Sequence, residues 1–235
     1  MLIDLAKKTW NYLIARNMNL SVEYIPSKLN VEADFQSRNV TDNSEWKLHR
    51  THFQDICKTL GKPDIDLFAS RTSHQMLPYM SLKADPQCKA TDALQQDWAR
   101  SFPYAFPPFC LIGRTLKKVR LHKIDMILIT PIWPNQPWYP LILERLTHDP
   151  LLIAMNNQTL LNPQGKTHPL ISNGSLILGA WRVSGHPKKT QIYQAQLQNC
   201  WGNQNVQPHG IITTRPGRNL VAGVMNGKLI RFIAR

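Results

Sequence analysis

The stretch from residue 64 to residue 109 constrains the fold more than any other part of the chain. It opens with Asp64-Ile-Asp-Leu-Phe-Ala69, a short apolar run with two carboxylates, and closes with Phe106-Pro-Pro-Phe109. A strand that ends in carboxylates and a later Pro-Pro-aromatic loop fit together as a crevice at the carboxyl edge of an open α/β sheet. The continuous apolar run Met126-Ile-Leu-Ile-Thr-Pro131 predicts another buried strand of that sheet. We therefore expect an α/β fold with a small, open, Rossmann-like sheet and flanking helices.

Apolar residues at three-to-four spacing predict helices at three places along the chain. One covers residues 2–17. A second starts at Asn43-Ser-Glu-Trp46, continues through the apolar positions from Leu48 to Leu60, and ends before the helix-stopping sequence Gly61-Lys-Pro63. A third covers Ile112 to Val119. After residue 150 the chain is rich in Gly, Asn and Gln, and we expect a largely irregular basic tail there, with one short strand near Ser175–Trp181 and loop structure after Gly202.

The net charge of +13 is distributed unevenly. Residues 1–62 hold 9 basic and 7 acidic residues, residues 63–150 hold 10 and 8, and residues 151–235 hold 9 basic residues and no acidic one. Such a field attracts polyanions, so the expected partner is DNA or RNA, bound weakly and electrostatically; a basic tail that merely keeps the chain soluble is the alternative. The candidate contact residues are Lys117, Lys118, Arg120, Lys188, Lys189, Arg215 and Arg218.

The same sequence argues against several other classes of protein. The four cysteines are widely separated and form no C-x-x-C pair, so neither a disulfide framework nor a metal site is expected. No apolar run approaches the length of a membrane span, and the first residues lack the order of a secretory signal. We expect an intracellular protein, nuclear or cytoplasmic, that is not secreted; the oligomeric state stays open.

The order of motifs in the central stretch resembles the phage-type DNA adenine methyltransferases. Those enzymes have a D-x-D strand end, a D-A-L-x-x-D-W segment, here Asp92–Trp98, and an N-P-P-aromatic loop. The resemblance implies that Asp66, or alternatively Asp64, would hold S-adenosylmethionine. Pro107 and Pro108 would stiffen the loop, and Phe109 would stack on a base flipped out of the duplex.

One position of that loop departs from the family pattern. The family has Asn or Asp where this chain has Phe106, and a phenyl ring cannot accept a hydrogen bond from the adenine amino group. No glycine-rich G-x-G loop for the methyl donor occurs either. We expect methyl transfer to be lost or severely impaired, with no cofactor, or S-adenosylmethionine if the crevice survives. The plainer alternative is that the loop is a rigid apolar turn and that four aspartates have structural roles as caps and solvated strand ends: Asp64, Asp66, Asp92 and Asp97.

The beginning of the chain resembles the closing segment of retroelement RNase H domains, which reads N-x-x-A-D-x-x-S-R. Asn30, Ala33-Asp34 and Ser37-Arg38 match it. The resemblance makes Asp34 the last of four metal-binding carboxylates. Two-metal hydrolysis needs oxygen ligands from several elements, and the other three motifs are not present in this chain, so RNase H activity is not expected.

Together these features resemble a fragment of a DIRS-type retrotransposon polyprotein. The D-L-F-A-S-R run, Trp133–Tyr139 and Leu176–Gly185 are similar to segments of those elements, the last lying before a tyrosine recombinase. The implied organisation is an RNase H remnant over residues 1–40, a methyltransferase-like module over 41–150 and a basic linker over 151–235. We expect an inactive fragment that binds nucleic acid; the alternatives are an active DNA adenine methyltransferase and a host-recruited protein-interaction module.

Overall fold

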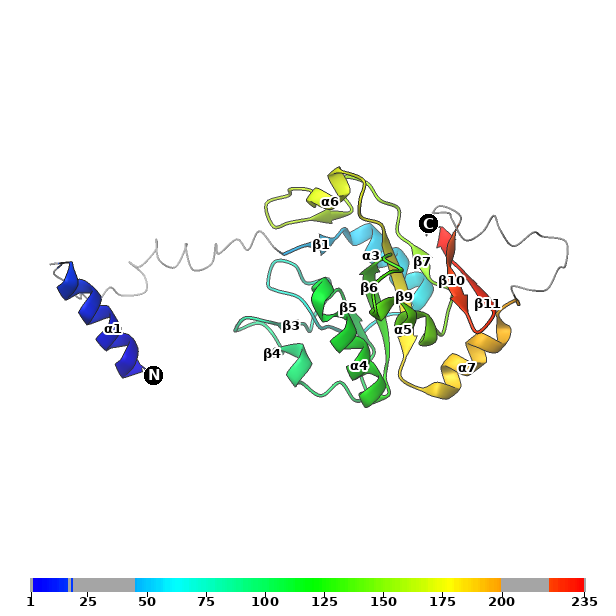
Figure 1. Ribbon diagram of the computed structural model, residues 1–235, viewed down its shortest axis with the longest axis horizontal. Coiled ribbons are helices and arrows are strands. Elements are labelled where there is room, and N and C mark those ends of the chain that lie inside the picture. The colour runs from blue at the N-terminus through cyan, green and yellow to red at the C-terminus, as the bar shows by residue number, and fades with distance from the viewer. Residues whose placement is uncertain (1, 17, 19–44, 200–219, 235) are drawn as a thin grey trace. The chain divides into compact units, whose positions relative to one another are not determined.

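The computed structural model describes residues 2–16, 18, 45–199 and 220–234 (Figure 1). The chain divides into two compact units, Met1–Thr41 and Asp42–Arg235. In the first unit the described element is helix α1 (Leu2–Ala15), which confirms the helix expected there. The second unit is a mixed α/β structure around a central mixed sheet, which confirms the expected α/β class.

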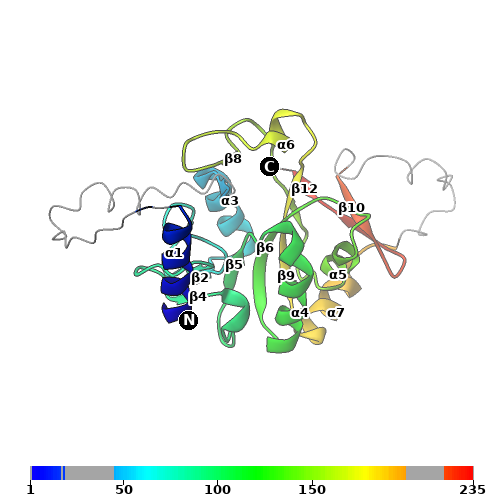
Figure 2. The same cartoon turned by 60° about the vertical axis from the view of Figure 1, so that its left-hand side comes forward.

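The central sheet has six strands in the order β12–β7–β9–β6–β5–β2. Strands β2, β5 and β6 run parallel, β9 runs antiparallel to both β6 and β7, and β12 is parallel to β7. Figure 2 shows β5, β6 and β9 side by side. The strands are β2 (Ile65–Asp66), β5 (Pro103–Ala105), β6 (Asp125–Pro131), β7 (Leu151–Leu152), β9 (Leu178–Ser184) and β12 (Ile233–Ala234).

Helices cover both faces of this sheet, as the unbroken apolar character of β6 requires. Met126 and Leu128 of β6 enter a core with helices α4 and α5, whereas Ile127 and Ile129 enter a second core with helix α3. The helices are α3 (Arg50–Leu60), α4 (Ile112–His122), α5 (Trp138–Glu144), α6 (Pro169–Ser172) and α7 (Pro187–Gln196), with the 3-10 turns η1 (Ala93–Gln95) and η2 (Phe109–Leu111).

Short strand pairs complete the unit beside the central sheet. A parallel pair, β3 (Met80–Ser81) and β4 (Ala90–Thr91), follows β2 in the chain. An antiparallel pair joins β1 (Lys47–Leu48) to β8 (Leu160–Leu161).

The expectation of a largely irregular tail after residue 150 is wrong. Strand β9 lies in the middle of the sheet and pairs with β6 over seven residues. The chain also forms a hairpin of β10 (Val221–Met225) and β11 (Lys228–Arg231), and it ends in β12. The side chains of Ile230 and Phe232 are buried in the core. Gly179 and Gly223 lie inside β9 and β10, so the Gly-rich composition does not exclude strands, which here are fixed by distant partners.

Candidate functional site

The topology creates a switch point between β2 and β5. After β2 the chain continues to Tyr79, which forms a parallel bridge with Asp66, and then to the β3–β4 pair. It next returns to place β5 on the opposite side of β2. In open α/β sheets, ligands bind outside the carboxyl ends of the strands at such a reversal of strand order. The carboxyl ends of β2 and β5 are therefore the candidate site.

A small pocket lies at this point. Its volume is about 10 Å³, which is room for about one water molecule. Asp66 and Phe68 contribute from the end of β2, and Tyr104 and Phe106 from β5 and the loop after it. The remaining lining residues come from two other segments of the chain: Trp46, Lys47, Leu48, Ser73 and Gln75.

Asp66 is the chemically unusual group of this pocket. Its side chain is 2% exposed, and its Oδ2 accepts a hydrogen bond of 2.9 Å from the Gln75 N–H. Its Oδ1 is buried and has no hydrogen-bond partner in the protein. Burial raises the pKa of Asp66 to about 7, and the backbone N–H groups of Gln75 and Phe68 and the charge of Lys47 oppose this shift only in part. The carboxyl group can therefore carry a proton near neutral pH.

Residues 45–48, which we call the closing segment, cover the pocket. Leu48 is fully buried, and its carbonyl oxygen accepts a hydrogen bond of 2.5 Å from Gln75 Nε2. The Glu45 carboxylate accepts hydrogen bonds from the hydroxyl groups of Ser70 and Thr72. The segment is further held by the pairing of β1 with β8. Contacts on both sides thus fix the closing segment over the carboxyl ends of β2 and β5.

The Pro-Pro loop follows β5 at the same edge of the sheet. Phe106 lines the pocket, and its ring centroid lies 6.5 Å from that of Phe109. Phe109 in turn meets Trp133 edge-to-face at 5.1 Å, so the loop is packed against the end of β6. Both phenylalanines are half-buried. Pro107 is buried, and Pro108 caps the 3-10 turn η2.

The structure separates the two aspartates that were candidates for cofactor binding. Asp66 lies at the pocket, but Asp64 precedes β2 and therefore lies at the opposite end of the strand. Asp64 Oδ2 accepts a hydrogen bond of 2.8 Å from the Phe102 N–H. Two further aspartates of the motif act as local caps, since Asp92 accepts from the Leu94 N–H and Asp97 from the Ala99 N–H.

The candidate nucleic-acid contacts divide into exposed and internally bonded side chains. Lys118 Nζ donates to the Leu94 carbonyl oxygen at 2.9 Å, and Lys189 Nζ lies 2.6 Å from Asp125 Oδ2. Four of the candidate residues are exposed, namely Lys117, Arg120, Lys188 and Lys189, the last of them in spite of its contact with Asp125. Three candidate residues lie outside the described residues: Asp34, Arg215 and Arg218.

S-adenosylmethionine does not fit the pocket described above. Sites for ligands of that size enclose roughly 300–1,000 Å³, whereas this pocket holds about 10 Å³. Sequence reasoning missed the residues responsible, because Trp46 and Leu48 reach the pocket only through the pairing of β1 with β8. The only feature of the sequence that pointed to this pocket was the apolar run ending at Asp66, which predicted a buried strand end.

Neither a metal-ligand cluster nor a membrane-spanning helix occurs in the described part of the chain. Over residues 2–16, 18, 45–199 and 220–234, no three His, Cys, Asp or Glu side chains gather as metal ligands would. Within those same ranges, no helix has the length and apolar character needed to cross a membrane. No protein-family model matches the chain, and a comparison with curated proteins finds no match.

Proposed function

We propose that this chain is part of a DIRS-type retroelement polyprotein whose methyltransferase-like module no longer transfers methyl groups and instead contributes electrostatic binding of nucleic acid. The observation that carries the loss of methyl transfer is the closed switch point. Trp46, Leu48 and Phe106 line the pocket there, and its volume of about 10 Å³ supports the absence of a bound methyl donor. The motif resemblance supports the retroelement origin.

Phe106 supplies a second reason for inactivity. The phenyl ring offers no acceptor for an adenine amino group, and sites that leave a polar group unpaired typically lose several orders of magnitude in discrimination. The ring also lines the pocket, where the family residue would present a polar group. Opening the pocket alone would therefore not restore the chemistry.

An active adenine methyltransferase remains the second candidate, and the buried carboxyl group of Asp66 favours it. Its Oδ1 has no partner in the protein and faces the pocket at the switch point, where a polar ligand group would satisfy it. This candidate requires the closing segment to move away from the ends of β2 and β5. It therefore predicts binding of S-adenosylmethionine by the wild-type chain.

A calorimetric titration with S-adenosylmethionine separates the two candidates. We expect no heat of binding from the folded wild-type chain at micromolar to sub-millimolar ligand, and no methyl incorporation into duplex DNA. The variants are Phe106→Asn, which restores the family residue, and Trp46→Ala, which shortens the closing segment. Micromolar binding by the wild-type chain, or detectable adenine methylation by the wild-type chain at a rate equal to that of Phe106→Asn, would overturn the proposal of inactivity.

The nucleic-acid part of the proposal is tested by the salt dependence of binding. Electrostatic binding to phosphates weakens steeply between 50 and 200 mM salt. Binding to a protein partner that does not weaken with salt, together with no affinity for DNA or RNA, would favour the host-recruited interaction module.

A further inference from the structure

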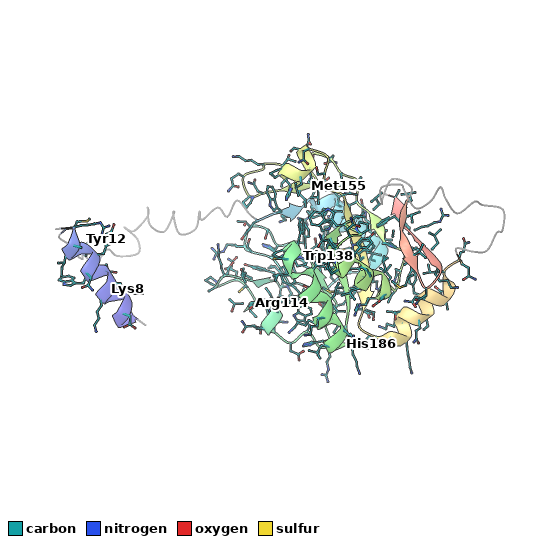
Figure 3. All side chains as sticks on the ribbon, in the orientation of Figure 1. Lys8, Tyr12, Arg114, Trp138, Met155 and His186 are labelled. Atoms are coloured by element: carbon teal, nitrogen blue, oxygen red, sulfur yellow. The ribbon has the colours of Figure 1, made fainter. Side chains whose placement is uncertain are left out.

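The closing segment is joined to the second unit by one short strand pair and a few side-chain contacts. Its strand β1 pairs with two residues of β8, in a small sheet that is separate from the six-stranded one. Glu45 adds the hydrogen bonds from the two hydroxyl groups described above. Figure 3 labels Met155, from the loop before β8, at the end of the unit where β1 and β8 lie, and His186 at the opposite end. The segment can therefore leave the pocket without breaking a strand pairing of the central sheet.

Gln75 links the closing segment directly to Asp66. Its backbone N–H donates to Asp66 Oδ2 at 2.9 Å, and its side-chain Nε2 donates to the Leu48 carbonyl oxygen at 2.5 Å. Both of these partners belong to buried residues, and the exposed fraction is 2% for Asp66 and 0% for Leu48. A change at the Asp66 carboxyl group is therefore transmitted through a single residue to the segment that covers it.

The closed arrangement leaves the carboxyl group of Asp66 incompletely bonded. Its Oδ1 is buried and has no hydrogen-bond partner within the described residues, and the pocket beside it has room for about one water molecule. An ionised carboxylate is costly in such a place, because burial removes the water that would stabilise its charge. The ionised form of Asp66 therefore favours an arrangement in which more water reaches Oδ1.

Two other ionisable side chains line the pocket, Lys47 of the closing segment and Tyr104 of β5. Burial lowers the pKa of Lys47, the charge of Asp66 opposes this shift, and the charge of Arg50 at the start of α3 adds to it. Burial, together with the charge of Asp66, raises the pKa of Tyr104, so its hydroxyl group stays neutral. Asp66 is therefore the group of this pocket whose charge changes near neutral pH.

The pocket, the buried carboxyl group and its cover together form a conformational switch. We propose that the closing segment is a cover that leaves the carboxyl ends of β2 and β5 when the Asp66 carboxyl group loses its proton and gains water. The closed form remains the major one, because opening exposes the fully buried side chain of Leu48. A rise in pH increases the open population, in which a small polar molecule can reach Oδ1. The inference does not depend on the proposed function, since it concerns the chain without methyl donor or nucleic acid.

Amide hydrogen exchange of the full chain, measured by NMR from pH 5 to 8, tests this inference. The His49 N–H donates to the Thr159 carbonyl oxygen of the chain before β8 at 2.9 Å. Lys47, two residues earlier, faces Leu161 of β8 in the same antiparallel pattern. Both amides should exchange when the segment leaves β8. With a pKa of about 7 in the closed form and an ordinary value of about 4 in the open form, their protection factors should fall about 50-fold from pH 5 to 7, and less than about twofold from pH 7 to 8.

Three variants separate the carboxyl group from the contacts around it. Asp66→Asn should abolish the dependence of the protection factors on pH. The matched control is Asp64→Asn, at the opposite end of the same strand, which should keep the full dependence. Gln75→Ala removes the hydrogen bond to the Leu48 carbonyl oxygen, so it should lower protection by about 2–10-fold at every pH and keep the dependence.

Urea distinguishes a local opening of the cover from unfolding of the whole unit. Urea at about 1 M should speed exchange of the amides in β6 and leave that of Lys47 and His49 nearly unchanged, because a local opening exposes little surface. Equal urea dependence at both places would overturn the inference, since the segment would then open only by global unfolding. No fall in protection from pH 5 to 7, or the same fall in Asp66→Asn as in the wild type, would overturn it as well.

Discussion

Truncation of one side chain near the end of the chain tests whether the last strands are part of the core. Phe232 is 4% exposed, and its ring centroid lies 5.2 Å from that of the fully buried Trp181. Replacing a buried Phe by Ala removes its transfer free energy and leaves a cavity, at a cost of about 3–5 kcal/mol. Since domains are stabilised by only about 5–15 kcal/mol, Phe232→Ala should lose a large share of the free energy of unfolding.

Urea unfolding, followed by far-UV circular dichroism and tryptophan fluorescence, measures this loss. The control is Ile233→Ala at the neighbouring position, where the side chain is 40% exposed, and we expect it to cost less than about 1.5 kcal/mol. In a thermal melt, Phe232→Ala should lower Tm by roughly 6–20 °C. A loss below about 1 kcal/mol, or one no larger than that of Ile233→Ala, would refute the placement of this segment in the core.

Two further predictions concern the pocket and the base of α7. The pKa of Asp66 is raised to about 7, so the folded state holds a proton that the unfolded state releases near pH 4. The free energy of unfolding should therefore fall by about 1.4 kcal/mol per pH unit as pH rises from about 4 to 7. Urea titrations across that range should show that Asp66→Asn removes this pH dependence. If Asp66→Asn keeps the same dependence of unfolding free energy on pH as the wild type, the raised pKa of Asp66 is contradicted. Gly185→Ala should destabilise the fold by about 1–3 kcal/mol or more, because the new methyl group meets backbone atoms of α4. The control is Gly113→Ala in helix α4, where a new methyl group would point into open space; it should stabilise the fold by about 0.5–1 kcal/mol in the same assay. Equal effects of the two substitutions would show that α4 and the turn at Gly185 are not in contact.

Local patterns predicted the elements that carry their own periodicity. The apolar run at Met126 became β6, and the helix expected from Ile112 became α4. The helix expected before Gly61 became α3, but its predicted start near Trp46 was wrong, because Lys47 and Leu48 form strand β1 and α3 begins at Arg50. These segments are long enough for the burial of one or both faces to produce a recognisable pattern of apolar residues. The strand pattern near Ser175 was also read correctly, within a few residues of β9.

The remaining structure depends on pairings between distant segments. Strands β7 and β12 are each two residues long, and they pair with each other although they are far apart in the sequence. Such short strands leave no periodic pattern in the sequence that could predict them. The lack of acidic residues after residue 150 concerns side chains that lie mostly at the surface, so it gives no information on these strand pairings. Which of Asp64 and Asp66 faces the pocket depends on the limits of β2, and the closure of the pocket depends on β1 meeting β8.

The position of β9 has a consequence for synthesis of the protein. Strand β6 is complete at Pro131, but its antiparallel neighbour is complete only at Ser184. During translation at about 5–20 residues per second, the N–H and C=O groups of β6 that pair with β9 therefore stay unpaired for several seconds. An unpaired apolar strand is a template for aggregation. A nascent chain that stops near residue 150 should consequently be insoluble or need a chaperone, and expression boundaries belong outside residues 42–234.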